Sequence, residues 1–173
     1  YINESKKKYG YPKFVHTTTG KNKKERIISN IEKLRGSIKM DMAVQSTTPE
    51  VLKNIRRDNI STEHLIAIGP AIKKTGMTLS SDIIVGLPGE TFESTLQSIK
   101  DIIHADVDEV HLWTLMMLDG SELNVPMERE KWNIKTKYRI IPRDFVKLSN
   151  GKVVLEIEEV GISTSTLSFK EYV

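Results

Sequence analysis

The 173-residue sequence contains no cysteine at all. Disulfide bonds and thiolate metal sites are therefore excluded for this chain. No apolar run is long enough to span a bilayer, and aromatic residues make up only 6% of the chain. With 38% hydrophobic and 28% charged residues, the composition fits a soluble globular protein of ordinary domain size. We expect a cytoplasmic protein with no membrane partner.

A strong charge of one sign is also missing, since the formal net charge is only +3. The basic clusters at 6–8, 21–24 and 56–57 are not interleaved with aromatic residues, as a single-strand nucleic-acid groove would require. We therefore predict no nucleic-acid partner. The chain starts without methionine, and residues 1–9 have the pattern of a helix end closed by Gly10. We interpret this start as a truncation inside a larger fold.

Strand and helix patterns alternate along the first two thirds of the chain. Strands are predicted over 13–19, 37–44, 77–85 and 107–117, and helices over 22–34, from Pro49 onward, over 61–74 and over 91–105. Strict alternation of this kind requires a parallel sheet with right-handed crossovers, either a barrel or a doubly wound sheet. The strands read as nearly continuous apolar runs, which indicates cover on both faces.

Details of two helices can be predicted. Gly69-Pro70 should kink or split the helix over 61–74, because proline removes a backbone donor. In the helix over 91–105, Phe92, Leu96, Ile99 and Ile103 fall on one face.

Beyond about residue 119 the pattern changes. The stretch 124–133 is polar and irregular, a strand pattern ends at Pro142, and 153–160 alternates after a turn at 149–151. We expect residues 1–124 to form the α/β part. Residues 125–173 should form a small appendage with an antiparallel hairpin and a short helix.

In α/β proteins ligands bind at the carboxyl ends of the strands. This rule selects Gln45 and Ser46 after the second strand, and the loop from Gly86 to Glu90 after the third. Arg57, at the end of the next short helix, could hold a carboxylate with its guanidinium. Taken alone, the loop is an ordinary strand-to-helix turn and Arg57 a solvated charge at a helix end.

Asp82 lies in a strand made otherwise mostly of apolar residues. A buried carboxylate without a partner is costly. Asp82 is therefore satisfied by neighbouring donors or accepts hydrogen bonds from a pair of ligand hydroxyls, and the sequence leaves both readings open.

These segments together resemble the second half of the barrel of radical S-adenosylmethionine (SAM) enzymes, over about residues 13–122. Within this family the pattern is most similar to the members associated with a cobalamin-binding domain. The residues that carry the resemblance are Gln45-Ser46, Pro49-Glu50-Val51-Leu52-Lys53, Arg57 and Asp82-Ile83-Ile84-Val85-Gly86-Leu87-Pro88-Gly89-Glu90. The resemblance implies about four parallel strands of a (β/α)6 TIM-type barrel, hence a partial barrel.

The resemblance also implies roles for a set of cofactor-binding residues, and it assigns no catalytic side chain and no metal ligand to this chain. Gln45 would meet the ribose or methionine part of SAM, with Ser46 beside it. Arg57 would hold the methionine carboxylate, and Asp82 would accept from the ribose hydroxyls. The residues expected around the adenine and the close backbone turn are Ile84, Gly86, Leu115 and Met116.

Radical SAM enzymes hold a [4Fe-4S] cluster with three cysteines, and this chain has none. The first strands of the family's barrel are also missing from the pattern. Truncation would explain both departures. The resemblance thus implies a fragment of an enzyme that uses SAM and a [4Fe-4S] cluster to make a 5′-deoxyadenosyl radical, with cobalamin bound, if at all, through another domain. The fragment alone should be inactive, and its small-molecule substrate is not identified.

Two other readings stay open. One is a TIM-type enzyme whose Gly86 loop binds phosphate or a sugar, with His16, His104 and His111 as acid–base candidates. The other is a non-catalytic assembly module. A half-barrel leaves sheet edges uncovered, so a homodimer formed through these edges is a further expectation.

Overall fold

The computed structural model describes residues 1–18, 38–57, 62–74 and 76–173, and the helix predicted over 22–34 lies outside these ranges. Contacts divide the chain into two units. The first comprises Tyr1–Ile83 and Glu93–Trp113, and the second comprises Ile84–Phe92 and Thr114–Val173. In the part that the structure describes, no helix is both long and apolar enough to cross a bilayer.

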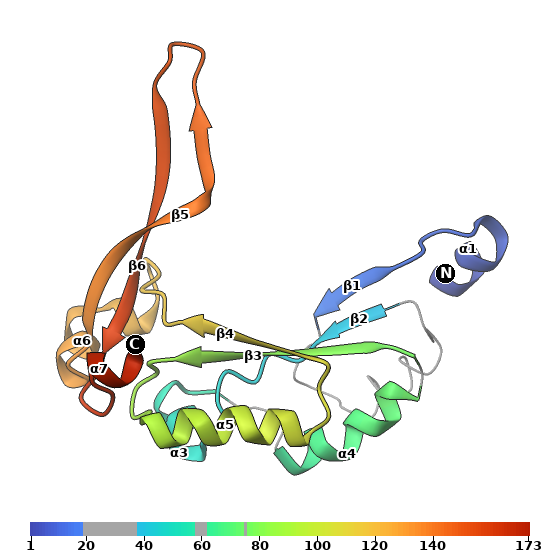
Figure 1. The fold of residues 1–173 in the computed structure, drawn as a ribbon, viewed down its shortest axis with the longest axis horizontal. Helices are drawn as coiled ribbons and strands as arrows, with labels where there is room; N and C mark the ends of the chain where they lie inside the picture. Colours follow the sequence, from blue (N-terminus) through green and yellow to red (C-terminus); the bar gives the residue numbers. More distant parts are fainter. Residues whose placement is uncertain (19–37, 58–61, 75) are drawn as a thin grey trace. The chain divides into compact units, whose positions relative to one another are not determined.

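A four-stranded sheet dominates the first unit (Figure 1). Its strands lie in the order of the sequence, β1-β2-β3-β4, and the pairs β1–β2 and β2–β3 are parallel. The elements are α1 (Ile2–Tyr9), β1 (Val15–Thr18), β2 (Ile38–Asp41), α3 (Pro49–Asn54), α4 (Thr62–Lys73), β3 (Thr78–Val85), α5 (Phe92–His104) and β4 (Glu109–Thr114). The predicted parallel α/β arrangement is confirmed.

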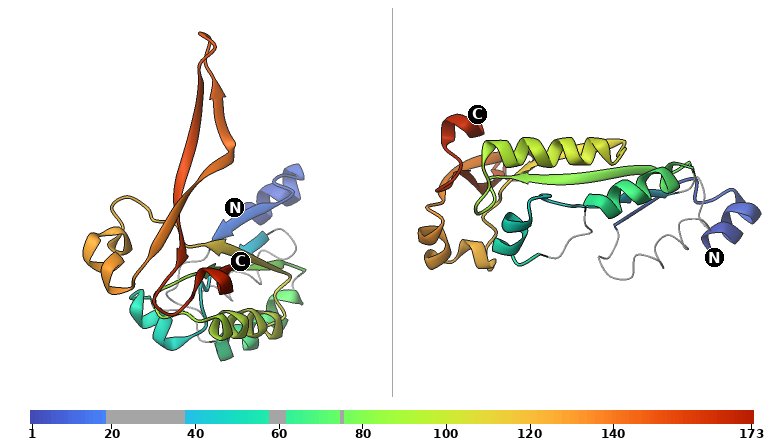
Figure 2. Two further views of the ribbon diagram at one scale, coloured as in Figure 1. Left: turned by 60° about the vertical axis from the view of Figure 1, so that its left-hand side comes forward. Right: turned by 90° about the horizontal axis from the view of Figure 1, so that it is seen from below.

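The core of this unit lies between the sheet and two helices. Helices α4 and α5 cover the same side of the sheet (Figure 2). They contribute Ile72 and Ile102, which pack against strand residues such as Leu79 and Ile83; these side chains are at most 1% exposed. Burial of such side chains stabilises the fold by about 1.5–3 kcal/mol each.

The structure corrects two details of the predicted helices, because α4 is not split at Pro70 and most of the apolar face of α5 is not buried. Helix α4 runs without a break through Pro70. In α5 the buried residues are Thr95, Ser98 and Ile102, whereas most of the predicted apolar face is exposed. Small polar side chains allow α5 to approach the segment after β2, where the Ser98 hydroxyl accepts from the Thr47 backbone N–H at 3.0 Å. Hydrogen bonding thus outweighs the apolar stripe in orienting this helix.

The second unit contains a long antiparallel hairpin. Its elements are η1 (Glu122–Asn124), α6 (Pro126–Lys131), β5 (Lys135–Lys147), β6 (Val153–Ser163) and α7 (Phe169–Tyr172). The hairpin prediction is confirmed, but β5 continues past Pro142 because the register shifts between Ile140 and Phe145. The stretch predicted as irregular contains α6, which begins at Pro126.

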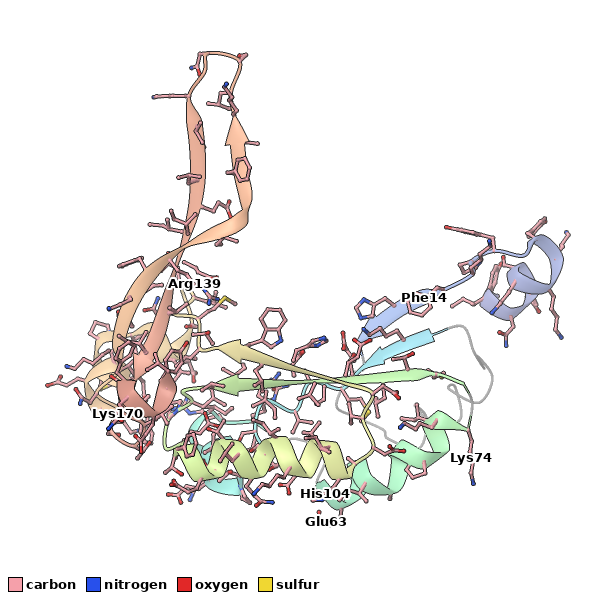
Figure 3. The ribbon with its side chains drawn as sticks, in the orientation of Figure 1. Phe14, Glu63, Lys74, His104, Arg139 and Lys170 are labelled. Atoms are coloured by element: carbon pink, nitrogen blue, oxygen red, sulfur yellow. The ribbon has the colours of Figure 1, made fainter. Side chains whose placement is uncertain are left out.

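One face of this hairpin is apolar and exposed. Cross-strand register places Ile140 opposite Ile157 and Phe145 opposite Leu155, and all four side chains are 49–61% exposed. A two-stranded ribbon is only marginally stable by itself in water. Figure 3 shows the side chains along both strands of the hairpin, from Arg139 upward.

Candidate functional site

The segment after β2 presents Gln45 in an unusual conformation. Gln45 has a φ of 63°, a left-handed value that costs a non-glycine residue about 1–2 kcal/mol. Its backbone N–H donates to Asp82 O at 2.8 Å, which extends the parallel pairing of β2 with β3. Its side-chain Oε1 is buried, and no described residue donates a hydrogen bond to it. Strain together with an unsatisfied acceptor marks a functional position.

Arg57 lies beside the same segment. Its backbone N–H donates to Leu52 O at 2.9 Å, which closes the turn after α3, and its Nη2 donates to Ala43 O at 2.9 Å. Partial burial lowers the pKa of Arg57 below its ordinary value, although the guanidinium stays charged at neutral pH. The Ala43 carbonyl thus holds Nη2 of the Arg57 guanidinium beside the segment that follows β2.

Ser46 faces the other way. It is completely buried, its Oγ accepts from the Thr48 N–H at 3.2 Å, and it lies 3.4 Å from Ser98 Oγ on α5. Thr48 is the N-cap residue of α3 but forms no capping hydrogen bond with its own side chain. These contacts describe a residue that shapes the turn between β2 and α3, and the predicted contact of Ser46 with a cofactor stays a prediction.

Asp82 is held by side chains from β4. Its Oδ1 accepts from Trp113 Nε1 at 3.0 Å and lies 3.1 Å from His111 Nδ1, and 26% of its side chain is exposed. Neighbouring donors thus satisfy one carboxylate oxygen. The sequence left open whether neighbours or a ligand would serve Asp82, and the structure supplies neighbours for Oδ1 among the described residues.

The polar contacts of Asp82 continue across the sheet, on the face opposite to Leu79 and Ile83, which pack against α4 and α5. His111 Nε2 lies 3.6 Å from Glu109 Oε2, and Glu109 in turn pairs with Lys39. On β1 and β2, His16 Nε2 contacts Asp41 Oδ2 at 2.8 Å. The expectation that both faces of the sheet are covered by apolar packing was therefore wrong. The strands alternate, with Leu79 and Ile83 inward and Asp82 outward.

Asp41 is the most strongly engaged carboxylate of this face. Partial burial alone would raise its pKa, but hydrogen bonds from Ser80 and His16, and the nearby charges of His16 and Lys39, outweigh that effect. The pKa of Asp41 therefore lies below its ordinary value. An ionised Asp41 is an acceptor for its neighbours across the pH range of ordinary assays.

In the second unit the glycine loop closes on its own carboxylate. Glu90 is completely buried, and its Oε2 accepts from the backbone N–H groups of Gly86 at 2.8 Å and Leu87 at 3.3 Å. Gly86 and Gly89 have φ values of 91° and 83°, which an L-residue rarely adopts. The donors that would hold a phosphate are thus engaged by Glu90. This arrangement weighs against the alternative of a phosphate-binding loop.

The residues predicted to flank an adenine lie in the same unit. Leu115 donates its N–H to Val85 O at 3.1 Å and accepts from Gly161 N–H at 2.8 Å, so both backbone groups are engaged. Met116 forms an isolated bridge with Val160, and its side chain is 41% exposed. Their contact with an adenine, like that of half-buried Ile84, stays a prediction.

The structure thus places Gln45 and Arg57 at the segment after β2 and pairs Gln45 with Asp82 of β3 within one unit. Gly86, Ile84, Leu115 and Met116 belong to the other unit. Sequence analysis missed Trp113 and named His111 only as an acid–base candidate of the alternative enzyme reading. The alternation Glu109-Val110-His111-Leu112-Trp113 is the signal that could have found them.

The remaining histidine candidate, His104, is exposed at the carboxyl-terminal end of α5 (Figure 3). Within 1–18, 38–57, 62–74 and 76–173, no three side chains of the metal-binding types gather in one place. Neither observation adds support to an acid–base or metal mechanism built on histidine.

Comparison with known proteins identifies relatives of the chain by sequence. No family model matches the chain. A curated relative is the cobalamin-dependent radical SAM methyltransferase TokK of Streptomyces tokunonensis, 24% identical over 140 residues that cover 77% of this chain and 20% of TokK. The chain is a homologue of radical SAM enzymes.

Solved structures agree with the homology to radical SAM enzymes. The archaeal Elp3 of Methanocaldococcus infernus, with residues 1–46 deleted, matches with a TM-score of 0.51 and 26% identity over 67% of this chain and 26% of that chain. The radical SAM methyltransferase TsrM from Kitasatospora setae matches in fold, with a TM-score of 0.50 and 13% identity over 76% of this chain and 25% of that one. The chain spans about a fifth of the length of the curated relatives it matches.

Proposed function

We propose that this chain forms the SAM-binding side of a radical SAM enzyme that abstracts hydrogen from a small-molecule substrate. The observation that carries the proposal is Gln45, whose strained backbone and buried, unsatisfied Oε1 lie at the strand end beside Arg57 and Asp82. An unsatisfied buried acceptor is expected where a ligand normally supplies the donor. The residues present therefore fit SAM.

Each polar side chain offers a group that SAM can use. Gln45 Oε1 can accept from the ribose or the methionine ammonium, and the Arg57 guanidinium can pair with the methionine carboxylate. Asp82 Oδ2 can accept from the ribose hydroxyls. The contacts of Ile84, Gly86, Leu115 and Met116 with the adenine stay a prediction from the resemblance, because these residues belong to the other unit. When bound, SAM would supply the radical chemistry for hydrogen abstraction, and Gln45, Arg57 and Asp82 would hold and orient it.

The residues of this chain do not fit the cluster itself, since no cysteine is present. We therefore place the cluster ligands outside this chain and expect the chain alone to be inactive. The name of TokK supports a cobalamin-dependent subgroup. A cobalamin would bind through another domain.

The strand order also supports a structural proposal. Strands that are neighbours in sequence and in space, with helices on one side, are the arrangement of a TIM-type barrel. We propose that β1 to β4 are consecutive strands of a (β/α)6 barrel, within residues 1–124, and that 125–173 is an extension.

Binding of SAM to the chain tests the function. Equilibrium dialysis with radiolabelled SAM should show saturable binding. Gln45→Ala, Arg57→Met and Asp82→Asn should each weaken binding about tenfold or more, equivalent to roughly 1.4 kcal/mol.

The controls match these variants in chemistry. Gln97→Ala removes an amide on α5 that is bonded to Asp101, and Arg139→Met removes a guanidinium on the hairpin that is paired with Glu158. Both should bind SAM like the unaltered chain. No saturable binding, or equal losses in tested and control variants, would contradict the proposal.

A further inference from the structure

The Asp82 carboxylate has an asymmetric environment. Both of its contacts to described side chains, Trp113 Nε1 at 3.0 Å and His111 Nδ1 at 3.1 Å, are made by Oδ1. Because an ionised carboxylate only accepts hydrogen bonds, His111 must carry its proton on Nδ1. Two donors on one oxygen restrict the rotation of the carboxylate, and Oδ2 is the oxygen that these two side chains do not contact.

Both donors come from the same face of β4. His111 and Trp113 are two residues apart in the strand, so their side chains leave the same face, and their rings lie 6.2 Å apart at an angle of 54°. His111 is held in turn by Glu109, at 3.6 Å from its Nε2, and Glu109 is held by Lys39 of β2. This chain of contacts links three strands and ends on Asp82.

Trp113 is otherwise poorly placed for a structural role. It is 53% exposed, so the ring contributes little to the core. Its indole N–H nevertheless meets a carboxylate at good hydrogen-bond distance. Trp113 thus exposes a large ring and uses its single polar atom on one oxygen of Asp82. This arrangement suits a side chain that orients the Asp82 carboxylate.

We infer that Trp113, assisted by His111, is a positioning residue that holds Asp82 so that Oδ2 accepts from a ribose hydroxyl of the bound nucleoside. The inference rests on the proposed function, because it takes Asp82 as the ribose acceptor. Fixing the carboxylate before binding removes the entropic cost of ordering it when the ligand arrives. Loss of Trp113 Nε1 therefore weakens binding only for ligands that carry the hydroxyl.

A cycle of protein and ligand changes isolates this effect. Titration calorimetry on the chain would use S-adenosylhomocysteine and its 2′,3′-dideoxyribose analogue as probes. Trp113→Phe keeps the ring but removes the donor, and should weaken binding of S-adenosylhomocysteine about fivefold to tenfold. The same variant should leave binding of the dideoxy analogue unchanged. In the Asp82→Asn variant, the additional change Trp113→Phe should lower the affinity for S-adenosylhomocysteine only slightly further.

The second donor allows a rescue experiment, which also covers the case that Trp113→Phe fails to fold. His111→Phe removes Nδ1 and should weaken binding of S-adenosylhomocysteine, whereas His111→Asn restores a donor at the position of Nδ1 and should recover most of the affinity. The control is Trp132→Phe, since Trp132 Nε1 donates to the Glu128 carboxylate at 2.9 Å in the other unit. It should change neither affinity.

The outcomes separate this inference from the function on which it rests. If Asp82→Asn weakens binding but Trp113→Phe and His111→Phe do not, the positioning role is wrong and the SAM site stands. Equal losses of Trp113→Phe for both probes would also overturn it, because a structural defect does not discriminate between sugars. If the unaltered chain binds neither probe, the proposed function itself fails.

Discussion

Glu90 Oε2 accepts a hydrogen bond from the Gly86 N–H, at 2.8 Å, so the carboxylate closes the loop that opens four residues earlier. The Glu90 carbonyl accepts in turn from Thr166 Oγ1 at 2.6 Å. Glu90 Oε2 thus occupies the backbone donors of Gly86 and Leu87 in the glycine loop, which resembles an anion site in sequence.

Replacement of Glu90 should destabilise the second unit. Glu90→Ala leaves the buried N–H groups of Gly86 and Leu87 without this acceptor and should lower the free energy of unfolding by about 2–3 kcal/mol. Glu90→Gln keeps a neutral acceptor and should lose less. Urea denaturation measures both. Glu93→Gln, at an exposed position in the first turn of α5, is the matched control and should have little effect. An undiminished stability of Glu90→Ala would contradict the closure.

Gly69 should tolerate no side chain. A Cβ at this position would lie 2.3 Å from Ala105 O, a backbone atom that cannot move without shifting the end of α5. In an open helix Gly→Ala is stabilising by about 1 kcal/mol, but here we expect Gly69→Ala to be destabilising by roughly 1–3 kcal/mol. Urea denaturation followed by Trp113 fluorescence in a Trp132→Phe background reports on the first unit. Ala67→Gly, at an exposed position of α4, calibrates helix propensity. A gain in stability for Gly69→Ala would show that the helices do not approach so closely.

The pair of Arg129 with Glu159 should make the second unit sensitive to acid. Arg129 Nη1 donates to Glu159 Oε1 at 2.8 Å and Thr136 Oγ1 donates to the same oxygen at 2.5 Å, and the hydrogen bond of Arg129 contributes most to lowering the pKa of Glu159 to about 2. Since the unfolded value is near 4.5, the pair stabilises the fold above pH 4.5. This contribution is lost as the pH falls from 4.5 to 2.

The expected size is about 1–2 kcal/mol, because solvent screens a pair that is partly exposed. Unfolding followed by Trp132 fluorescence in Trp113→Phe, at pH 7, 4 and 2.5, measures it. The Glu159→Gln variant should be less stable than the unaltered protein at pH 7. Its free energy of unfolding should also change less with pH. Equal pH slopes for both proteins would rule out this role of the ion pair.

Self-association is expected at high protein concentration. The outer edge of β1 and the apolar face of the hairpin are two surfaces on which a second copy could pack. Light scattering should show a mass that rises with concentration. Leu155→Lys should reduce the rise if the hairpin face is the contact, whereas Val154→Lys, on the opposite face of the hairpin, should not. An unchanged rise in both variants would favour the sheet edges, and a monomer at every concentration would contradict the proposed dimer.

Local sequence signals were sufficient for much of the fold. The β-branched strands and their order predicted the parallel sheet, Gly10 ended α1, and the turn at 149–151 predicted the hairpin. Such features depend on neighbouring residues and on period, which the sequence displays directly. The strand-end rule selected Gln45 in advance, and the resemblance to radical SAM enzymes added Arg57 and Asp82.

Other features depended on residues far apart in the chain. The donors to Asp82 Oδ1 come from 29 and 31 residues away, and the buried face of α5 follows its hydrogen bonds to the turn after β2 rather than its apolar period. No periodicity shows that Glu90 turns back on Gly86 or that Ser46 faces α5. The sequence by itself determined the order of strands and the types of residue at their ends. Only the tertiary structure decided which atoms of those residues are already hydrogen-bonded, such as Asp82 Oδ1, because that depends on distances across the sheet.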